Sequence, residues 1–195
     1  MARPHEFDMD VALDATMSAF WTKGYDATSM TDLVRATGLQ KGSIYKAFDD
    51  KHDLFMKSLT RYLDSAHEAM TVALTGPESP LEGLHAWLQG VVLMCRDEPV
   101  CRGCLAMNTA VELGPHDTVV RSLLQRHHAR ASKILTETIS SGQQAGQIRS
   151  DLTADQLAKT IFVFAAGLLG TSKVLADTID AEEMVESALA LVAPG

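Results

Sequence analysis

The sequence lacks the apolar segments that would indicate export or membrane insertion. The first ten residues, MARPHEFDMD, contain no apolar run, and the longest apolar stretch, residues 161–170, is about half the length of a membrane span. We therefore expect a cytoplasmic protein. In that compartment the three cysteines, Cys95, Cys101 and Cys104, are expected to be reduced thiols rather than a disulfide framework.

Patterns typical of enzymes are also absent. No nucleophile and base stand in a recognisable motif, and the sequence contains no glycine-rich phosphate loop. The cysteines give one C-x-x-C and one C-x5-C spacing, without the second pair of ligands that structural zinc sites have. We therefore expect no enzymatic activity, no cofactor and no metal site. A metal-binding regulator that uses cysteine and histidine side chains is kept as an alternative.

Positive charge is scarce, since the chain carries a formal net charge of −8. A nucleic acid requires a positive face on its partner, so this balance argues at first against DNA binding. Residues 35–61, however, contain six basic side chains and only three acidic ones. A basic patch on an acidic body is typical of a protein that touches phosphates with one surface only.

The expected fold class is all-α. No segment alternates apolar and polar residues as a strand would, and apolar residues recur at helical spacing along most of the chain. Helices are expected over residues 8–23, 29–38, 41–48, 52–73, 81–97, 104–113, 117–141, 153–176 and 181–193. We expect two domains, a DNA-binding domain over residues 1–50 and a second domain over residues 51–195.

The two short helices before residue 50 have the features of a helix-turn-helix. Ser29 and Asp32 form a capping-box pattern that opens the first helix, and Gly38 permits the sharp turn that ends it. Ile44 and Phe48 recur at helical spacing and are expected to hold the second helix against the body. The remaining side chains of that helix would then face outward. An ordinary pair of solvated helices, in a helical interaction protein without a DNA role, is the alternative.

Three blocks of spaced residues lie between residues 19 and 55. The first, F-x-x-x-G-Y-x-x-T-S, comprises Phe20, Gly24, Tyr25, Thr28 and Ser29. The second, G-L-x-x-G-x-x-Y-x-x-F, comprises Gly38, Leu39, Gly42, Tyr45 and Phe48, and the third, K-x-x-L-F, comprises Lys51, Leu54 and Phe55. Together these blocks resemble the DNA-binding domain of the TetR family of bacterial repressors, with Thr37 where that family usually has alanine before the glycine.

The resemblance implies a set of DNA contacts. Thr28, Lys41, Tyr45 and Lys51 would touch phosphates, and Gln40, Ser43 and Lys46 would reach bases. Gly42 keeps the leading end of the recognition helix slim, so that it can approach the DNA backbone closely. The partners implied are a palindromic double-stranded DNA operator and a small-molecule effector that releases a repressor from it.

The resemblance also implies a homodimer. The helix at 161–175 is apolar nearly all round and carries small residues, which let helices approach closely. In the family this helix and the last one pair with their copies in a four-helix interface. The alternative is a core helix that packs only within its own chain.

Candidate effector-binding residues lie on three of the expected helices. Trp87, Val91 and Met94 form one stripe. Further candidates are Cys104, Met107, Asn108 and Val111 on the next helix and His127 on the long helix after it. Asparagine within an apolar stripe needs a partner or offers one to a ligand. Methionine and tryptophan stripes are also common in plain cores, so a plain core is the alternative.

The segment that contains Cys104 shows a second, weaker resemblance, to one branch of the same family. The segment Arg102–Asn108 is similar to a G-C-L segment in the N-ethylmaleimide-repressor-like branch of the TetR family, in which a cysteine reacts with electrophiles or oxidants. That resemblance implies Cys104 as the reactive thiol and Lys173 as its neighbour. A buried structural thiol is the alternative.

Overall fold

A computed structural model of the chain describes residues 8–96, 101–175 and 180–194. The described residues form nine α-helices and contain no strand, which confirms the expected all-α class. In chain order the helices are α1 Met9–Lys23, α2 Met30–Thr37, α3 Lys41–Ala47, α4 Lys51–Thr75, α5 Pro80–Arg96, α6 Leu105–Glu112, α7 Thr118–Gln144, α8 Ala154–Leu175 and α9 Ala181–Val192.

Short acidic or hydroxyl side chains determine where several helices begin. Asp8, Asp50, Asp117 and Asp180 each cap a helix by accepting hydrogen bonds from backbone N–H groups of its first turn. Ser29 and Asp32 form the expected capping box at the start of α2. These caps satisfy amides that have no partner within the helix, so neighbouring residues alone determine these helix starts.

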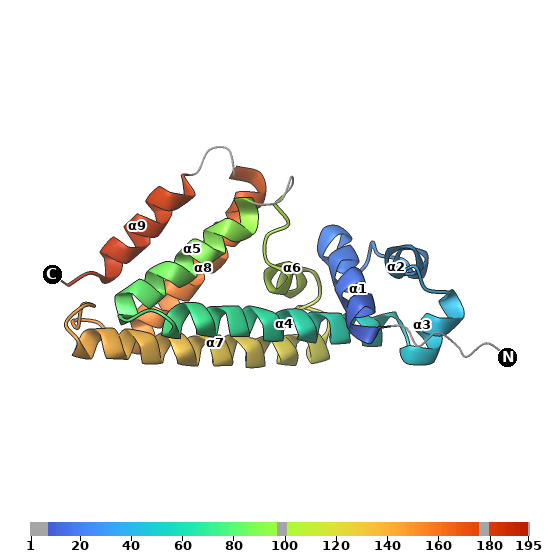
Figure 1. The fold of residues 1–195 in the computed structure, drawn as a ribbon, viewed down its shortest axis with the longest axis horizontal. Helices are drawn as coiled ribbons and strands as arrows, with labels where there is room; N and C mark the ends of the chain where they lie inside the picture. The colour runs from blue at the N-terminus through green and yellow to red at the C-terminus, as the bar shows by residue number, and fades with distance from the viewer. Residues whose placement is uncertain (1–7, 97–100, 176–179, 195) are drawn as a thin grey trace.

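The molecule is elongated, with α4 and α7 running side by side along much of its length (Figure 1). Helices α1, α2 and α3 lie at one end, while α5, α8 and α9 lie at the other. The short α6 lies between the two groups, beside α4 and α7. Helix α4 therefore links the N-terminal helices to the larger helical body.

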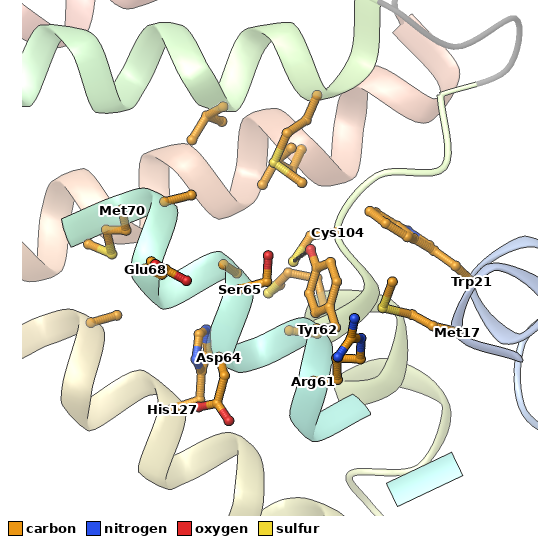
Figure 2. A pocket seen from close by; sticks show the side chains of 18 of the residues that line it. Met17, Trp21, Arg61, Tyr62, Asp64, Ser65, Glu68, Met70, Cys104 and His127 are labelled. Atoms are coloured by element: carbon orange, nitrogen blue, oxygen red, sulfur yellow. Dashed lines mark hydrogen bonds between the residues drawn. The ribbon is translucent and has the colours of Figure 1, made fainter. Parts of the chain in front are cut away.

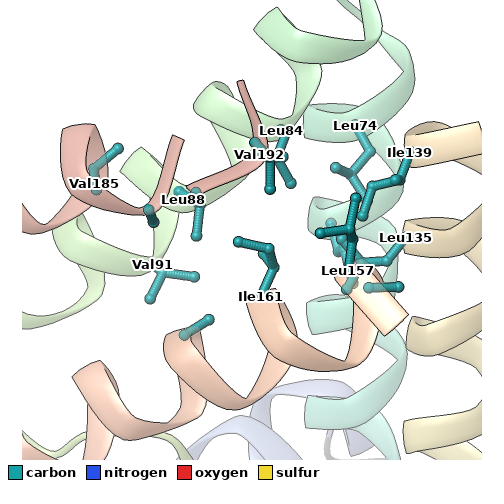
Figure 3. Packing of buried hydrophobic residues seen from close by; sticks show 14 of the residues in the cluster. Leu74, Leu84, Leu88, Val91, Leu135, Ile139, Leu157, Ile161, Val185 and Val192 are labelled. Atoms are coloured by element: carbon teal, nitrogen blue, oxygen red, sulfur yellow. The ribbon is translucent and has the colours of Figure 1, made fainter. Parts of the chain in front are cut away.

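Two clusters of buried hydrophobic residues hold this arrangement together. One gathers α5, α8 and α9 onto α4 and α7, with Leu88, Leu135 and Ile161 among its fully buried members (Figure 3). The other begins with Phe20 and Ile44 in the N-terminal helices and continues through α4 into α6 and α7. Because this second cluster continues past residue 50, the N-terminal helices share a core with the body. The expected domain boundary at residue 50 stays a prediction.

Helix α8 is buried along one side only. It packs against α5, α7 and α9, and its inward residues include Ile161 and Ala165. The opposite side carries a stripe at helical spacing, Val163, Gly167, Gly170 and Val174, whose members are all exposed. By length and hydropathy alone, residues 154–174 could also cross a membrane, a test that core helices of soluble proteins pass as well.

The cysteines differ from one another. Cys104 is a free thiol, as expected. Cys101 is disulfide-bonded, so the expectation of a reduced thiol is wrong for this residue. That expectation rested on the cellular compartment, whereas a disulfide also depends on how closely the fold brings two sulfur atoms together. The side chain of Cys95 lies outside the described residues.

Candidate nucleic-acid interface and effector cavity

The helix-turn-helix is built from α2 and α3. Gly38 ends α2 in the left-handed conformation, with φ +66°, a geometry that glycine adopts without strain. Ile44 and Phe48 are buried against the core of the N-terminal helices, as expected. Burial of this one side of α3 leaves its other side open.

Most of the predicted DNA-contacting residues lie on that open side. Gln40, Lys41, Gly42, Tyr45 and Lys46 are exposed. The Tyr45 side chain is 48% exposed although it is large and aromatic, and Lys41 Nζ lies 5.8 Å from the centre of its ring. An exposed aromatic ring flanked by cations suits contact with a phosphate backbone.

Three predicted contacts are less accessible. Ser43 is half-buried, and Lys51 is half-buried with its Nζ 4.3 Å from the centre of the Tyr25 ring. Thr28 is fully buried, and its hydroxyl donates to the carbonyl of Gly24 at 2.6 Å. The turn between α1 and α2 therefore uses this hydroxyl internally, and a phosphate contact by Thr28 stays a prediction.

Two acidic residues near the interface form ion pairs with neighbouring lysine side chains. The side-chain hydrogen bonds from Lys23 and Ser29 lower the pKa of Asp32, so this capping carboxylate is ionised at neutral pH. Asp53 accepts from Lys57 at 2.7 Å, and this bond lowers the pKa of Asp53. These pairs partly neutralise the negative charge beside the exposed cations of α3.

A cavity of about 1290 Å³ lies between the N-terminal helices and the body. Figure 2 shows Met17 and Trp21 reaching it from α1, Tyr62 and Met70 from α4, and His127 from α7. Its lining is mainly apolar, with aromatic and thioether side chains. Such a cavity, apolar with a few polar groups, is the usual form of a small-molecule site.

Most of the predicted effector-binding residues line this cavity. They are Trp87, Val91, Met94, Cys104, Met107 and His127. Asn108 and Val111 are not among the lining residues. Asn108 is used elsewhere, since it donates to the carbonyl of Arg102 at 2.9 Å and accepts from Lys173 Nζ at 2.7 Å. Val111 is 77% exposed, because α6 turns that side toward solvent.

Sequence reasoning missed the cavity residues that belong to the N-terminal half. Met17 and Trp21 lie on a helix that the motif assigns to DNA binding, and Tyr62 lies in the middle of α4. No local pattern marks them, because helical spacing alone does not tell which buried side will meet a cavity. Trp21 also donates through Nε1 to the carbonyl of Gly103 at 3.1 Å.

The polar groups of the cavity are largely uncharged or paired. Burial raises the pKa of Tyr62, which stays protonated and donates to Cys104 Sγ at 3.3 Å. Burial and then the neighbouring His67 lower the pKa of His127, so this imidazole is neutral at neutral pH. Asp14 is paired with Arg61 at 2.6 Å. Over residues 8–96, 101–175 and 180–194, no group of three or more acidic, histidine or cysteine side chains is arranged to hold a metal ion.

These features define a helix-turn-helix DNA-binding protein with a mainly apolar cavity beside its N-terminal helices. Comparisons with known proteins specify the class. A family model described as "Bacterial regulatory proteins, tetR family" matches residues 12–56, and one described as "Tetracyclin repressor-like, C-terminal domain" matches residues 80–188. The chain belongs to the TetR family of bacterial transcriptional regulators, which are DNA-binding proteins and not enzymes.

Three relatives illustrate the match. The HTH-type transcriptional repressor ComR of Escherichia coli K12 is 33% identical over 172 residues, which cover 85% of this chain and 80% of ComR. The regulator CifR, solved as a cysteine mutant with a 26-base-pair operator DNA, is 28% identical with a TM-score of 0.82, covering 98% of this chain and 100% of CifR. Reduced NemR of E. coli shares the fold at 18% identity, with a TM-score of 0.81 over 93% of each chain.

Proposed function

We propose that this protein is a cytoplasmic homodimeric repressor that a small molecule releases from a palindromic operator. One observation carries the proposal: Met17 and Trp21 of the DNA-binding unit form part of the wall of the cavity. A molecule that fills the cavity therefore contacts α1 directly. Because α1 packs against α2 and α4, such a contact can bias the position of the recognition helix.

The cavity wall indicates what kind of effector would fit. Its lining is mainly apolar, with five methionines among the lining residues, and at its edge Asp14 is ion-paired with Arg61 and Asp64 with Arg130. Burying an unpaired charge in such a place would be costly. We therefore propose an apolar or weakly polar effector, oriented by hydrogen bonds to Tyr62 or to neutral His127.

The homodimer is supported by the outer side of α8. An exposed stripe of valine and glycine costs free energy in water, and small residues allow a second helix to pack closely. Val163 and Val174 are 68% and 84% exposed in the single chain. A copy of α8 and α9 would cover this stripe and form a two-fold interface, as a palindromic operator requires.

Lys51→Ala tests the DNA interface. An operator duplex is first selected from randomised DNA by the wild-type protein. The variant should then bind both the selected and an unrelated duplex more weakly, because a phosphate contact carries no sequence information. The slope of log affinity against log salt should become shallower by about 0.9 for each phosphate that the variant no longer neutralises. Fluorescence anisotropy over a salt series measures both effects.

Two outcomes would count against this assignment. An unchanged salt slope would show that Lys51 meets no phosphate. A reduction confined to the selected duplex would make it a base contact. Lys133→Ala is the matched control, since it removes the same charge from a side chain that is 77% exposed on α7.

A second candidate function is thiol-based sensing through Cys104, favoured by the position of this thiol on the cavity wall. In that case its thiolate would add to an electrophilic alkene, forming a carbon–sulfur bond while the adjacent carbon takes a proton from water. A buried structural thiol would stay unmodified.

Treatment with N-ethylmaleimide tests the second candidate. Alkylation of Cys104 should weaken operator binding by the wild type about tenfold or more, roughly 1.4 kcal/mol, because the adduct occupies the cavity beside Trp21 and Tyr62. Cys104→Ser should bind the operator with or without the reagent, and Lys173→Met should slow the reaction. Mass spectrometry locates the adduct. If the reagent leaves Cys104 unmodified, or modifies it without releasing DNA, the thiol is structural and the effector is non-covalent.

A further inference from the structure

The last turn of α6 is hydrogen-bonded to the turn between α1 and α2. The carboxylate of Glu112 accepts from the backbone N–H of Tyr25 through Oε2 at 2.9 Å and from that of Asp26 through Oε1 at 2.8 Å. Both oxygens of one ionised side chain are thus used on two successive amides. Charge-assisted hydrogen bonds of this kind are stronger than neutral ones and fix direction as well as distance.

The turn is shaped to admit this carboxylate. Gly24 has φ +83°, in the left-handed region that favours glycine. A Cβ at this position would lie 3.0 Å from Oε2 of Glu112, closer than nearly all contacts of a real Cβ. Glycine at residue 24 therefore permits both the reversal of the chain after α1 and the approach of a side chain from α6.

The same turn controls the position of the DNA-contacting helices. It leads directly into the capping box that opens α2, and α2 packs against α3. Tyr25 itself packs edge-on against Phe55 of α4 and carries Lys51 over its ring. A shift of this turn would move α2, α3 and a predicted phosphate contact together.

The other end of α6 lies at the cavity. Cys104, the residue directly before α6, and Ala106 and Met107 in its first turn all line the cavity wall. Helix α6 has only eight residues, about two turns, so Glu112 at its end lies a short distance along the helix from the cavity wall.

We propose that Glu112 is a positioning residue for operator binding, which holds the α1–α2 turn, and with it the recognition helix, at a fixed place on the body. In a dimer this sets the distance between the two recognition helices, and so the half-site spacing that the protein accepts. The inference rests on the proposed homodimer and on the assignment of α3 to DNA.

Glu112→Gln tests the inference with little change in shape. The amide replaces one acceptor by an N–H donor that faces a backbone N–H, and it makes the other bond neutral. Binding is measured on the selected operator and on versions with the half-sites one base pair closer or farther apart. We expect affinity for the selected spacing to fall about tenfold, the order of one charge-assisted bond, and the preference among the three spacings to become markedly flatter.

Controls separate positioning from general damage. Glu137→Gln removes the same charge from an exposed side chain of α7 and should behave as wild type. If Glu112→Gln retains the wild-type preference, or binds every spacing more weakly by the same factor, the inference is wrong. If Glu112→Gln fails to fold, Glu112→Asp, which keeps the charge but is too short for both bonds, is judged by the same criterion. A wild type without any spacing preference would overturn the proposed dimer, and this inference with it.

Discussion

Gly170→Glu is expected to yield a monomer that binds the selected operator roughly a hundredfold or more weakly than the wild type. Gly170 lies in the exposed stripe of α8, and apart from the adjoining backbone of α8 no atom of the described residues lies within 4 Å of a Cβ added there. The substitution should therefore leave the single chain folded. In a close-packed interface, however, it would place two negative charges near one another, away from water.

The affinity for operator DNA should fall this far because the two DNA-binding modules are no longer linked. A dimer presents its second recognition helix at a high effective concentration once the first is bound, whereas a monomer does not. Light scattering at micromolar concentration measures the mass, and fluorescence anisotropy measures the affinity. Val72→Glu is the matched control, because it adds the same charge at an apolar site that is 65% exposed on α4. A wild type that is already monomeric would refute the proposed interface.

Lys46→Ala is expected to cost about 1–3 kcal/mol of operator binding, the range for a side chain that reads a base. Lys46 is exposed in the last turn of α3, so its removal should not affect folding. Binding should weaken more on the selected duplex than on unrelated DNA, and the sequence preference should relax at one position of each half-site. Repeating the selection from randomised DNA with the variant measures this directly.

Tyr45→Ala tests the same side of α3 without a change of charge. Its operator affinity should fall while the salt slope stays close to that of the wild type, because no cation is removed. Circular dichroism should show wild-type helix content for both variants, since neither side chain is in the core. If both variants bind the selected duplex as tightly as the wild type, α3 is not the recognition helix.

Local sequence patterns predicted the helices of this protein closely. The capping box at Ser29 and the left-handed Gly38 were both identified from residue types alone, and the structure confirms them. Such signals work because caps and turns depend on neighbouring residues. The largest boundary error came at α7, which was expected to end at residue 141. Its helix continues to Gln144 and passes through Gly142, where the absence of a side chain leaves room for Ile148.

The sequence alone determined which side of α3 faces outward in the helix-turn-helix, since the spacing of Ile44 and Phe48 leaves only one side for contact. The sequence alone did not determine which polar side chains form hydrogen bonds within the protein. Thr28 faces the carbonyl of Gly24, and Asn108 joins Lys173 to the carbonyl of Arg102. Those partners depend on the exact path of the backbone, which residue types do not encode locally.

Only the tertiary structure decided how the cavity is connected to the DNA-binding helices. Trp21 meets Gly103 across 82 residues of sequence, and Tyr25 meets Glu112 across 87. No periodicity links residues so far apart, because their contact results from the packing of whole helices along α4. Neighbouring residues therefore determined where the recognition helix lies in the sequence and which side of it is exposed. Packing between helices far apart in the sequence determined which residues line the cavity and which carboxylate bonds to the α1–α2 turn.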